Sequence, residues 1–243
     1  GIEFTNRFFS KKFMDPYYFA RINNSIIVTI GCNSPMETCW CNHLKTGPFL
    51  EKNFDLQLYD ISESFIVEIG SPKGEALISK HSQYFEDICQ DEAKPKMAYL
   101  KDESLKKFST KYPFDKALEA AANNKISKKA YEQYGNECLE CGACAFVCPT
   151  CTCFDVRDIK TKECISRCRQ WENCFFEGFT VEASGHNPRK IMADRIARRF
   201  NHKFQFETKN NEMIGCTGCG RCTIYCISKI GVHRFAELAA TVS

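Results

Sequence analysis

The sequence contains Cys138-Leu-Glu-Cys141-Gly-Ala-Cys144-Ala-Phe-Val-Cys148-Pro149 and Cys216-Thr-Gly-Cys219-Gly-Arg-Cys222-Thr-Ile-Tyr-Cys226, two runs with the same C-x2-C-x2-C-x3-C spacing. In two-cluster ferredoxins the first three thiolates of such a run bind one [4Fe-4S] cluster, and the fourth binds the other cluster. The runs therefore predict two neighbouring clusters in a protein that transfers electrons. The expected ligand sets are Cys138, Cys141, Cys144 and Cys226 for one cluster, and Cys216, Cys219, Cys222 and Cys148 for the other.

Zinc is the main alternative for these eight residues, because C-x2-C pairs also form structural zinc sites. A zinc site closes with four ligands, and the third cysteine of each run is not needed at this spacing. Small residues between the ligands also favour a cluster, since they let backbone N–H groups approach the sulfides.

The composition is that of a globular protein that stays in a reducing compartment. The chain has 243 residues, 44% of them hydrophobic, and its 17 cysteines are an odd number in a chain too long to need disulfides for stability. No stretch approaches the ~18 apolar residues of a membrane span, and no secretory leader opens the sequence. We expect a soluble, cytoplasmic protein. Because the sequence begins at Gly1 in what reads as structured sequence, we also expect an upstream segment to be missing.

The net charge gives no reason to expect a nucleic acid or a membrane surface as partner. The formal charge is +3 with all thiols neutral. Two oxidised clusters, each about −2 with its thiolates, bring the total to about −1.

Hydrophobic patterning predicts an α+β protein: an incomplete N-terminal α/β domain followed by a mainly helical dicluster ferredoxin domain. Residues 25–31 read as a buried strand, and residues 55–70 as two strands and a turn. Residues 75–134 read as helices broken at Pro95, Pro113 and Asn123-Asn124. We expect an α/β domain over 1–90, a helical connector over 91–135 and the dicluster domain over 136–243.

The 67 residues between Cys148 and Cys216 favour a helical dicluster domain. Bacterial-type ferredoxins have much shorter spacers between their runs, and residues 188–200 have the pattern of a helix.

Cys32, Cys39 and Cys41 follow the first expected strand and are candidate ligands of a third cluster. The fourth ligand is unknown: His43, Cys89 or a residue upstream of Gly1 are the sources considered. The alternative is buried structural thiols beside Trp40. A catalytic Cys-His-Asn arrangement of Cys41, His43 and Asn42 has no supporting geometry.

The remaining cysteines are interpreted as packing or reserve thiols. Cys151 and Cys153 lie near the clusters in sequence, and Cys164 and Cys168 are four apart, so that one helical face would carry both. The last two are Cys89 and Cys174.

A charge run between His186 and Lys203 has six basic residues and one acid. It is either a solvated helix face or a set of cations that compensates cluster charge or docks an acidic partner. Arg195 and Arg199 are the most interesting members, because they are four apart.

No nucleotide-binding or zinc-protease motif is present, which points to a subunit whose substrate chemistry lies in another chain. Six motifs in order resemble the iron-sulfur beta subunit of cytoplasmic nickel-iron sulfhydrogenases, and the A subunit of anaerobic sulfite reductases is similar. The motifs are Cys-x6-Cys-Trp-Cys-Asn from Cys32, Glu68-Ile-Gly-Ser-Pro-Lys-Gly74, Cys148-Pro-Thr-Cys-Thr-Cys-Phe-Asp-Val156, Arg169-Gln-Trp-Glu-Asn-Cys174, Gly185-His-Asn-Pro-Arg189 and Gly215-Cys-Thr-Gly-Cys-Gly-Arg-Cys222.

The resemblance implies a relay of [4Fe-4S] clusters between a flavoprotein subunit, which handles NAD(P)H through FAD, and a catalytic subunit in a hetero-oligomer. It assigns the eight cysteines of the runs as ligands, and it matches Cys32, Cys39 and Cys41 to the family's extra cysteines. Two positions depart from the family: Ile227 stands where proline is common, and Cys168 where arginine is usual. The sequence favours a hydrogenase partner over a sulfite reductase partner only weakly. Two other interpretations are not excluded: an iron-sulfur scaffold without redox turnover, and a self-contained reductase.

Overall fold

The computed structural model describes residues 1–10, 12–109, 111–211 and 213–241. Helices and strands occupy separate segments, so the α+β class expected from the sequence is confirmed. The chain divides into two compact units, residues 2–109 and residues 110–243, and Gly1 belongs to the second.

The first unit contains a three-stranded sheet in the order β1 (Val28–Ile30), β2 (Leu56–Asp60) and β3 (Phe65–Ile69). The first pair is parallel and the second antiparallel. Helices α1 (Ile2–Phe9) and α2 (Pro16–Asn23) precede the sheet. The segments that follow it are α3 (Pro72–Lys80), a 3-10 turn (Ser82–Tyr84) and α4 (Gln90–Lys106).

Helix α4 packs on the sheet. Its Ala93 is buried with Tyr59, Ile66 and Phe49, and Met97 packs against this core. Burial of these apolar groups is the main stabilising contribution in the unit.

Two of the sequence expectations for this unit are wrong in detail. Strand β1 is only three residues long, and Val28 and Ile30 are 47% and 65% exposed, because β1 is an edge strand paired on one side only. Pro95 does not break α4, since its missing N–H removes one bond near the beginning of a helix that the core contacts hold in place. The two strands and turn expected over 55–70 are confirmed as β2 and β3.

The second unit is mainly helical. Its helices are α5 (Phe114–Ala122), α6 (Lys128–Glu137), α7 (Ala143–Phe146), α8 (Met192–Asn201), α9 (Glu207–Asn211), α10 (Arg221–Ile224) and α11 (Gly231–Ala240). A 3-10 turn covers Glu177–Thr180, and a π-helical turn, His202–Phe206, joins α8 to α9.

Aromatic side chains form the core of this unit. Phe200 of α8 stacks on Phe235 of α11 with 3.8 Å between ring centroids. The buried Tyr134 hydroxyl of α6 donates to the Gly231 carbonyl at 2.8 Å. These contacts join three helices around the two cysteine runs.

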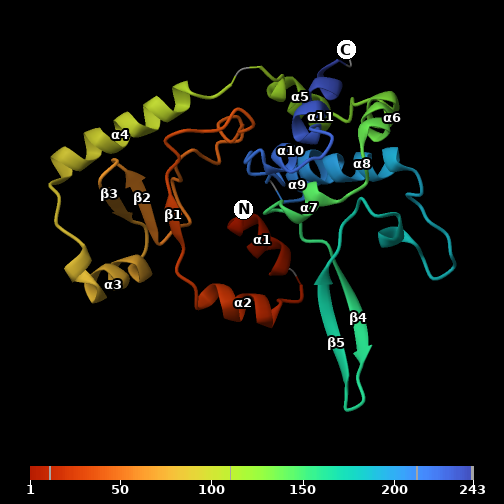
Figure 1. Ribbon diagram of the computed structural model, residues 1–243, viewed down its shortest axis with the longest axis horizontal. Coiled ribbons are helices and arrows are strands. Elements are labelled where there is room, and N and C mark those ends of the chain that lie inside the picture. The colour runs from red at the N-terminus through yellow and green to blue at the C-terminus, as the bar shows by residue number, and fades with distance from the viewer. Residues whose placement is uncertain (11, 110, 212, 242–243) are drawn as a thin grey trace. The chain divides into compact units, whose positions relative to one another are not determined.

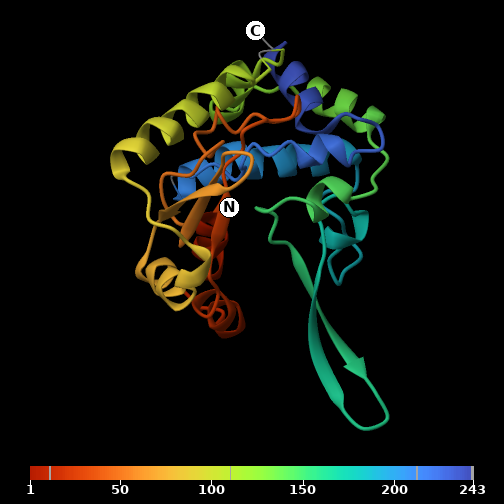
Figure 2. The ribbon, with the colours of Figure 1, turned by 60° about the vertical axis from the view of Figure 1, so that its left-hand side comes forward.

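Strands β4 (Phe154–Lys160) and β5 (Ile165–Trp171) form an antiparallel hairpin that extends away from the helices of its unit (Figures 1 and 2). Most of its side chains are exposed on both faces.

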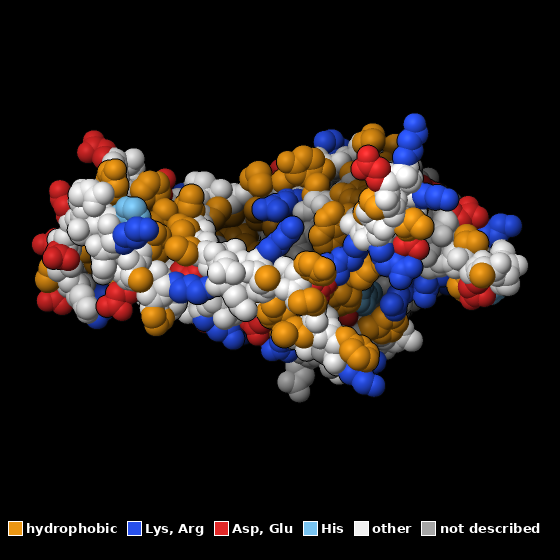
Figure 3. All heavy atoms as spheres, turned by 90° about the horizontal axis from the view of Figure 1, so that it is seen from below, with side chains coloured by type: hydrophobic (Ala, Val, Ile, Leu, Met, Phe, Trp, Pro, Cys, Tyr) orange, Lys and Arg blue, Asp and Glu red, His pale blue; other side chains and the backbone are white. Residues whose placement is uncertain are grey.

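No one type of side chain dominates the face shown in Figure 3. Lysine and arginine, aspartate and glutamate, and hydrophobic side chains lie side by side on the face in Figure 3. Among the helices of the described residues, none is long and apolar enough to span a bilayer.

Candidate iron-sulfur site

The two cysteine runs fold in the same way. In each, a loop turns through a glycine in the left-handed region, Gly142 with φ 72° or Gly220 with φ 68°, and a one-turn helix follows, α7 or α10. The helix carries the third cysteine of its run and ends before the fourth. The two runs, which have equal spacing in the sequence, therefore have the same local structure. Glycine suits the turn in each run because it takes a left-handed conformation without strain.

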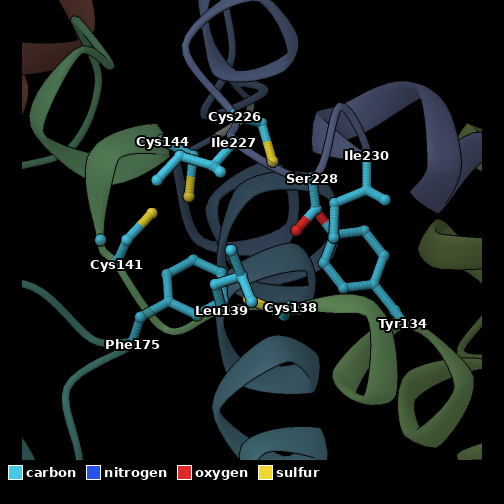
Figure 4. A pocket seen from close by; sticks show the side chains of 11 residues that line it. Tyr134, Cys138, Leu139, Cys141, Cys144, Phe175, Cys226, Ile227, Ser228 and Ile230 are labelled. Carbon is cyan, nitrogen blue, oxygen red and sulfur yellow. The ribbon is translucent and has the colours of Figure 1, made fainter.

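One hollow of the second unit is lined by four cysteines, and they form one of the two ligand sets expected from the sequence: Cys138, Cys141, Cys144 and Cys226. In Figure 4 the sulfurs of Cys141, Cys144 and Cys226 point toward the space between them. That space, counted with its part open to solvent, is about 380 Å³.

The walls of the hollow are mostly apolar. They include Tyr134, Leu139, Phe175, Ile227 and Ile230 (Figure 4). Burial raises the pKa of the Cys138 and Cys144 thiols, so the unligated thiols resist ionisation there.

Electrostatic interactions between the thiols indicate that the second expected ligand set lies together. Burial raises the pKa of Cys216 to about 12 and of Cys222 to about 11, and the neighbouring Cys148 thiolate adds to both shifts. Cys219 lies in the same loop and is half-buried. Cys148, Cys216 and Cys222 are thus close enough to influence one another's charge.

Lys203 lies against this second set. It is 6% exposed, and its Nζ donates to Cys148 Sγ at 3.2 Å, to Thr150 Oγ1 at 3.0 Å and to the Gly215 carbonyl at 2.9 Å. Burial opposes its charge, yet the Cys148 and Cys151 thiolates hold the pKa of Lys203 above its ordinary value.

Arg199 is equally buried and lies one helical turn before Lys203. Its guanidinium donates to Cys151 Sγ at 3.2 Å and to the Cys144 carbonyl at 2.8 Å. One turn earlier, Arg195 is 2% exposed and pairs with Glu140 at 2.8 Å. Of the two interpretations of the charge run, burial contradicts a solvated face for these three cations.

Arg199 and Lys203 require negative charge nearby. Within the described part of the chain no carboxylate forms an ion pair with either, and their polar contacts are thiols, a hydroxyl and carbonyls. An unpaired buried charge costs several kcal/mol or more. The thiolates of an iron-sulfur cluster, with a total charge of about −2, supply what is missing, so the donor set fits this cofactor.

An amide without a partner lies beside the first run. Asn173 is 1% exposed, its Oδ1 accepts from the Phe175 N–H at 2.8 Å, and its Nδ2 has no hydrogen-bond partner among the residues that the structure describes. A Cβ added to Gly142 would lie 2.2 Å from this Nδ2. The free donor therefore lies against the loop between Cys141 and Cys144, where a cluster sulfur would satisfy it.

Among the described residues, no three His, Cys, Asp or Glu side chains lie close enough together to hold one metal ion. In a [4Fe-4S] cluster, each of the four thiolates binds its own iron atom.

The three cysteines of the first unit lie in the long loop between β1 and β2. Burial raises the pKa of Cys41 to about 11, and the Cys39 and Cys32 thiolates add to the shift, so the three thiols are neighbours. The Ser104 hydroxyl of α4 donates to the Cys32 carbonyl at 2.6 Å and fixes the beginning of the loop. Cys89 precedes α4 and is exposed.

The expected helical face for Cys164 and Cys168 is wrong. Cys168 lies in β5 and Cys164 in the turn before it. At the other end of the hairpin, Cys153 and Cys174 are adjacent, and the hydrogen bond from Cys153 lowers the pKa of Cys174 to about 6.

The sequence reasoning missed Asn173 as a site residue and named Lys203 only as one member of the charge run. Lys203 had a signal: with Arg195 and Arg199 it completes a spacing of four and four, which places three cations along one side of a helix. Asn173 lies within the motif Arg169-Gln-Trp-Glu-Asn-Cys174, but the motif gives no reason for its role, which depends on a contact with a loop more than thirty residues away.

Residues 137–230 match a family model described as a 4Fe-4S dicluster domain. The second unit therefore contains an iron-sulfur domain of the electron-transfer class.

Over 234 residues, the chain is 32% identical to Sulfhydrogenase 2 subunit beta of Pyrococcus furiosus, with 95% of this chain and 67% of the relative covered. The chain belongs to this family of iron-sulfur beta subunits, as the sequence motifs indicate. No solved structure matches the chain.

Proposed function

We propose that this subunit relays electrons between a flavoprotein subunit, which takes electrons from NAD(P)H through FAD, and a catalytic hydrogenase or reductase subunit in a cytoplasmic hetero-oligomer. It does so through two [4Fe-4S] clusters. The observation that carries the proposal is the hollow lined by Cys138, Cys141, Cys144 and Cys226, because it unites three cysteines of one run with the last of the other.

In the proposed assignment, the second cluster is held by Cys148, Cys216, Cys219 and Cys222. Support comes from the mutual influence of three of these thiols and from the buried Lys203 beside them. Each bound cluster would accept and release one electron at a time. The crossed fourth ligands tie the two runs together and hold the two sites at a fixed separation.

The surrounding residues control access and charge. Phe175 and Ile230 give the first site apolar walls, and Asn173 offers an N–H donor to it. Arg199 and Lys203 balance the negative charge of the thiolates. None of these groups has to move for an electron to pass.

A third cluster at Cys32, Cys39 and Cys41 belongs to the same proposal, with its fourth ligand still to be found. The closeness of the three thiols supports it.

The test begins with the protein purified without oxygen and its iron counted. About eight irons per chain are expected for two clusters and about twelve for three, with electron paramagnetic resonance signals after reduction by dithionite. Zinc in place of iron, or fewer than about eight irons, would overturn the proposal.

Two variants separate a relay from a scaffold that uses clusters only to fold. Cys148→Ser and Cys226→Ser are expected to stop electron transfer through the assembled complex while its subunits still co-purify. Full turnover in an assembled variant that has lost a cluster would favour the scaffold. The identity of the co-purified subunits decides between a hydrogenase and a sulfite reductase.

A further inference from the structure

We propose that Lys203 makes the two clusters unequal: the cluster held by Cys148, Cys216, Cys219 and Cys222 is the easier one to reduce. This inference rests on the proposed function and adds to it the cluster on which a single electron resides.

The ammonium group of Lys203 is fixed at the sulfur of Cys148. Its contacts to Cys148 Sγ, Thr150 Oγ1 and the Gly215 carbonyl lie between 2.9 and 3.2 Å. Thr150 is held in turn, since its hydroxyl donates to the same Gly215 carbonyl at 2.7 Å. The charge therefore has one position, next to the thiolate that crosses from the first run to the second cluster.

The helix that carries Lys203 changes its geometry at this point. Arg195 and Arg199 lie in α8, and Lys203 is the second residue of the π-helical turn. Single π-helical turns inside helices occur frequently at functional sites. Here the π-helical turn carries Lys203, the third buried cation after Arg195 and Arg199, and places it against Cys148.

The first cluster site has no equivalent contact. Among the described residues, no lysine or arginine side chain donates to the sulfur of Cys138, Cys141, Cys144 or Cys226, and Arg199 reaches only the carbonyl of Cys144. Cys141 is also exposed, so water screens charges around this site.

Solvent exposure and the charge of Lys203 have opposite effects on which cluster is easier to reduce, and we expect the charge of Lys203 to be the larger effect. Water at the first site stabilises an added electron, and burial of the second site disfavours it. Lys203 supplies a full positive charge 3.2 Å from a ligand sulfur, in surroundings that screen it little. A charge-assisted N–H···S bond also stabilises the reduced cluster.

The experiment is a redox titration of the loaded, assembled protein, followed by electron paramagnetic resonance. In Lys203→Met, the equilibrium constant for reducing one cluster should fall at least tenfold, which is about 59 mV for one electron, while the other cluster is unchanged. Lys203→Arg keeps the charge and should restore most of the difference. Cys141→Ser should move the other potential and so assign the two steps.

Arg198→Met is the matched control. Arg198 lies on the same helix, and its guanidinium stacks on Phe206. Neither potential should change in this variant. If Lys203→Met does not fold, Thr150→Val, which removes one of the groups that fix the ammonium, should shift the same cluster in the same direction by a smaller amount.

The inference is overturned if a loaded Lys203→Met protein keeps both potentials, or if both potentials shift equally. That result differs from a failure of the proposed function, in which the unmodified protein itself would lack the clusters.

Discussion

Gly142 fills a position that a side chain cannot occupy without strain. Its φ is 72°, and an added Cβ would lie 2.2 Å from Asn173 Nδ2 and 2.9 Å from the Phe176 ring. From the sequence, small residues between the ligands were expected to let backbone N–H groups approach the sulfides. The structure gives a second reason for glycine at this position, which is the left-handed turn that starts α7.

Gly142→Ala is expected to destabilise the protein by at least about 1–2 kcal/mol, because an L-residue in the left-handed region carries that cost before any clash. Iron content should fall as well, since the loop carries Cys141 and Cys144. The measurement is urea unfolding of the loaded protein together with an iron assay. Gly178→Ala is the control: its Cβ would meet nothing within 4 Å, and equal losses in the two variants would contradict the explanation.

Asn173→Asp tests the free amide. The change keeps an oxygen that accepts from the Phe175 N–H but replaces the Nδ2 donor by a second, negative oxygen beside the first run. Repulsion from the thiolates should speed iron release to a chelator about tenfold or more, an effect of ~1.4 kcal/mol, within the range for a lost buried charge-assisted bond. Asn123→Asp, at an exposed helix end, should release iron at the original rate.

At the scale of elements, the hairpin is the part that the sequence pattern failed to predict. Cys164 and Cys168 are four apart, which is also a helical spacing, but Thr161 and Cys164 close a turn and the residues on either side pair as strands. Periodicity alone does not separate these cases when both faces of a strand are exposed. The helix expected over residues 188–200 is confirmed as α8, whereas the π-helical turn and α9 were not expected. The burial of the cations was not predictable either, because charged residues are almost always on the surface.

Cys164 should react quickly with iodoacetamide in the intact, loaded protein. It is exposed, and its hydrogen bonds with the Thr161 and Ser166 hydroxyls lower the pKa of its thiol. The rate should rise with pH through a midpoint below the usual thiol value, because only the thiolate reacts. Mass spectrometry locates the label, and Thr161→Val should move the midpoint upward. An unchanged midpoint in that variant would show that the hydroxyl has no such effect.

Across the whole molecule, the helical character of the second unit was predictable from local patterning, and the family from the resemblance of six ordered motifs. The hollow of the first ligand set joins residues from two runs that lie far apart in sequence, and the crossed pattern of ferredoxins anticipates this grouping. The burial of Lys203 and the contact of Asn173 with Gly142 depend on packing and appear only in three dimensions.

Removal of iron should loosen the second unit and leave the first sheet intact. Without clusters Cys138, Cys144, Cys216 and Cys222 are mainly protonated, since burial raises their pKa. Arg199 and Lys203 then keep only part of their compensating charge, on Cys148, whose pKa the hydrogen bond from Cys151 holds well below its ordinary value. Hydrogen exchange should therefore accelerate in α8 by at least tenfold but not in β2, which belongs to the other unit. Equal protection of α8 before and after iron removal would contradict this account.

The open side of the hollow in Figure 4 has a consequence for the life of the protein in air. Cys141 is exposed there and Leu139 is 62% exposed, so dioxygen would reach an iron atom bound by Cys141 without any motion of the chain. If the two proposed clusters are bound, oxidative damage should thus begin at the one beside Cys141 and reach the other later.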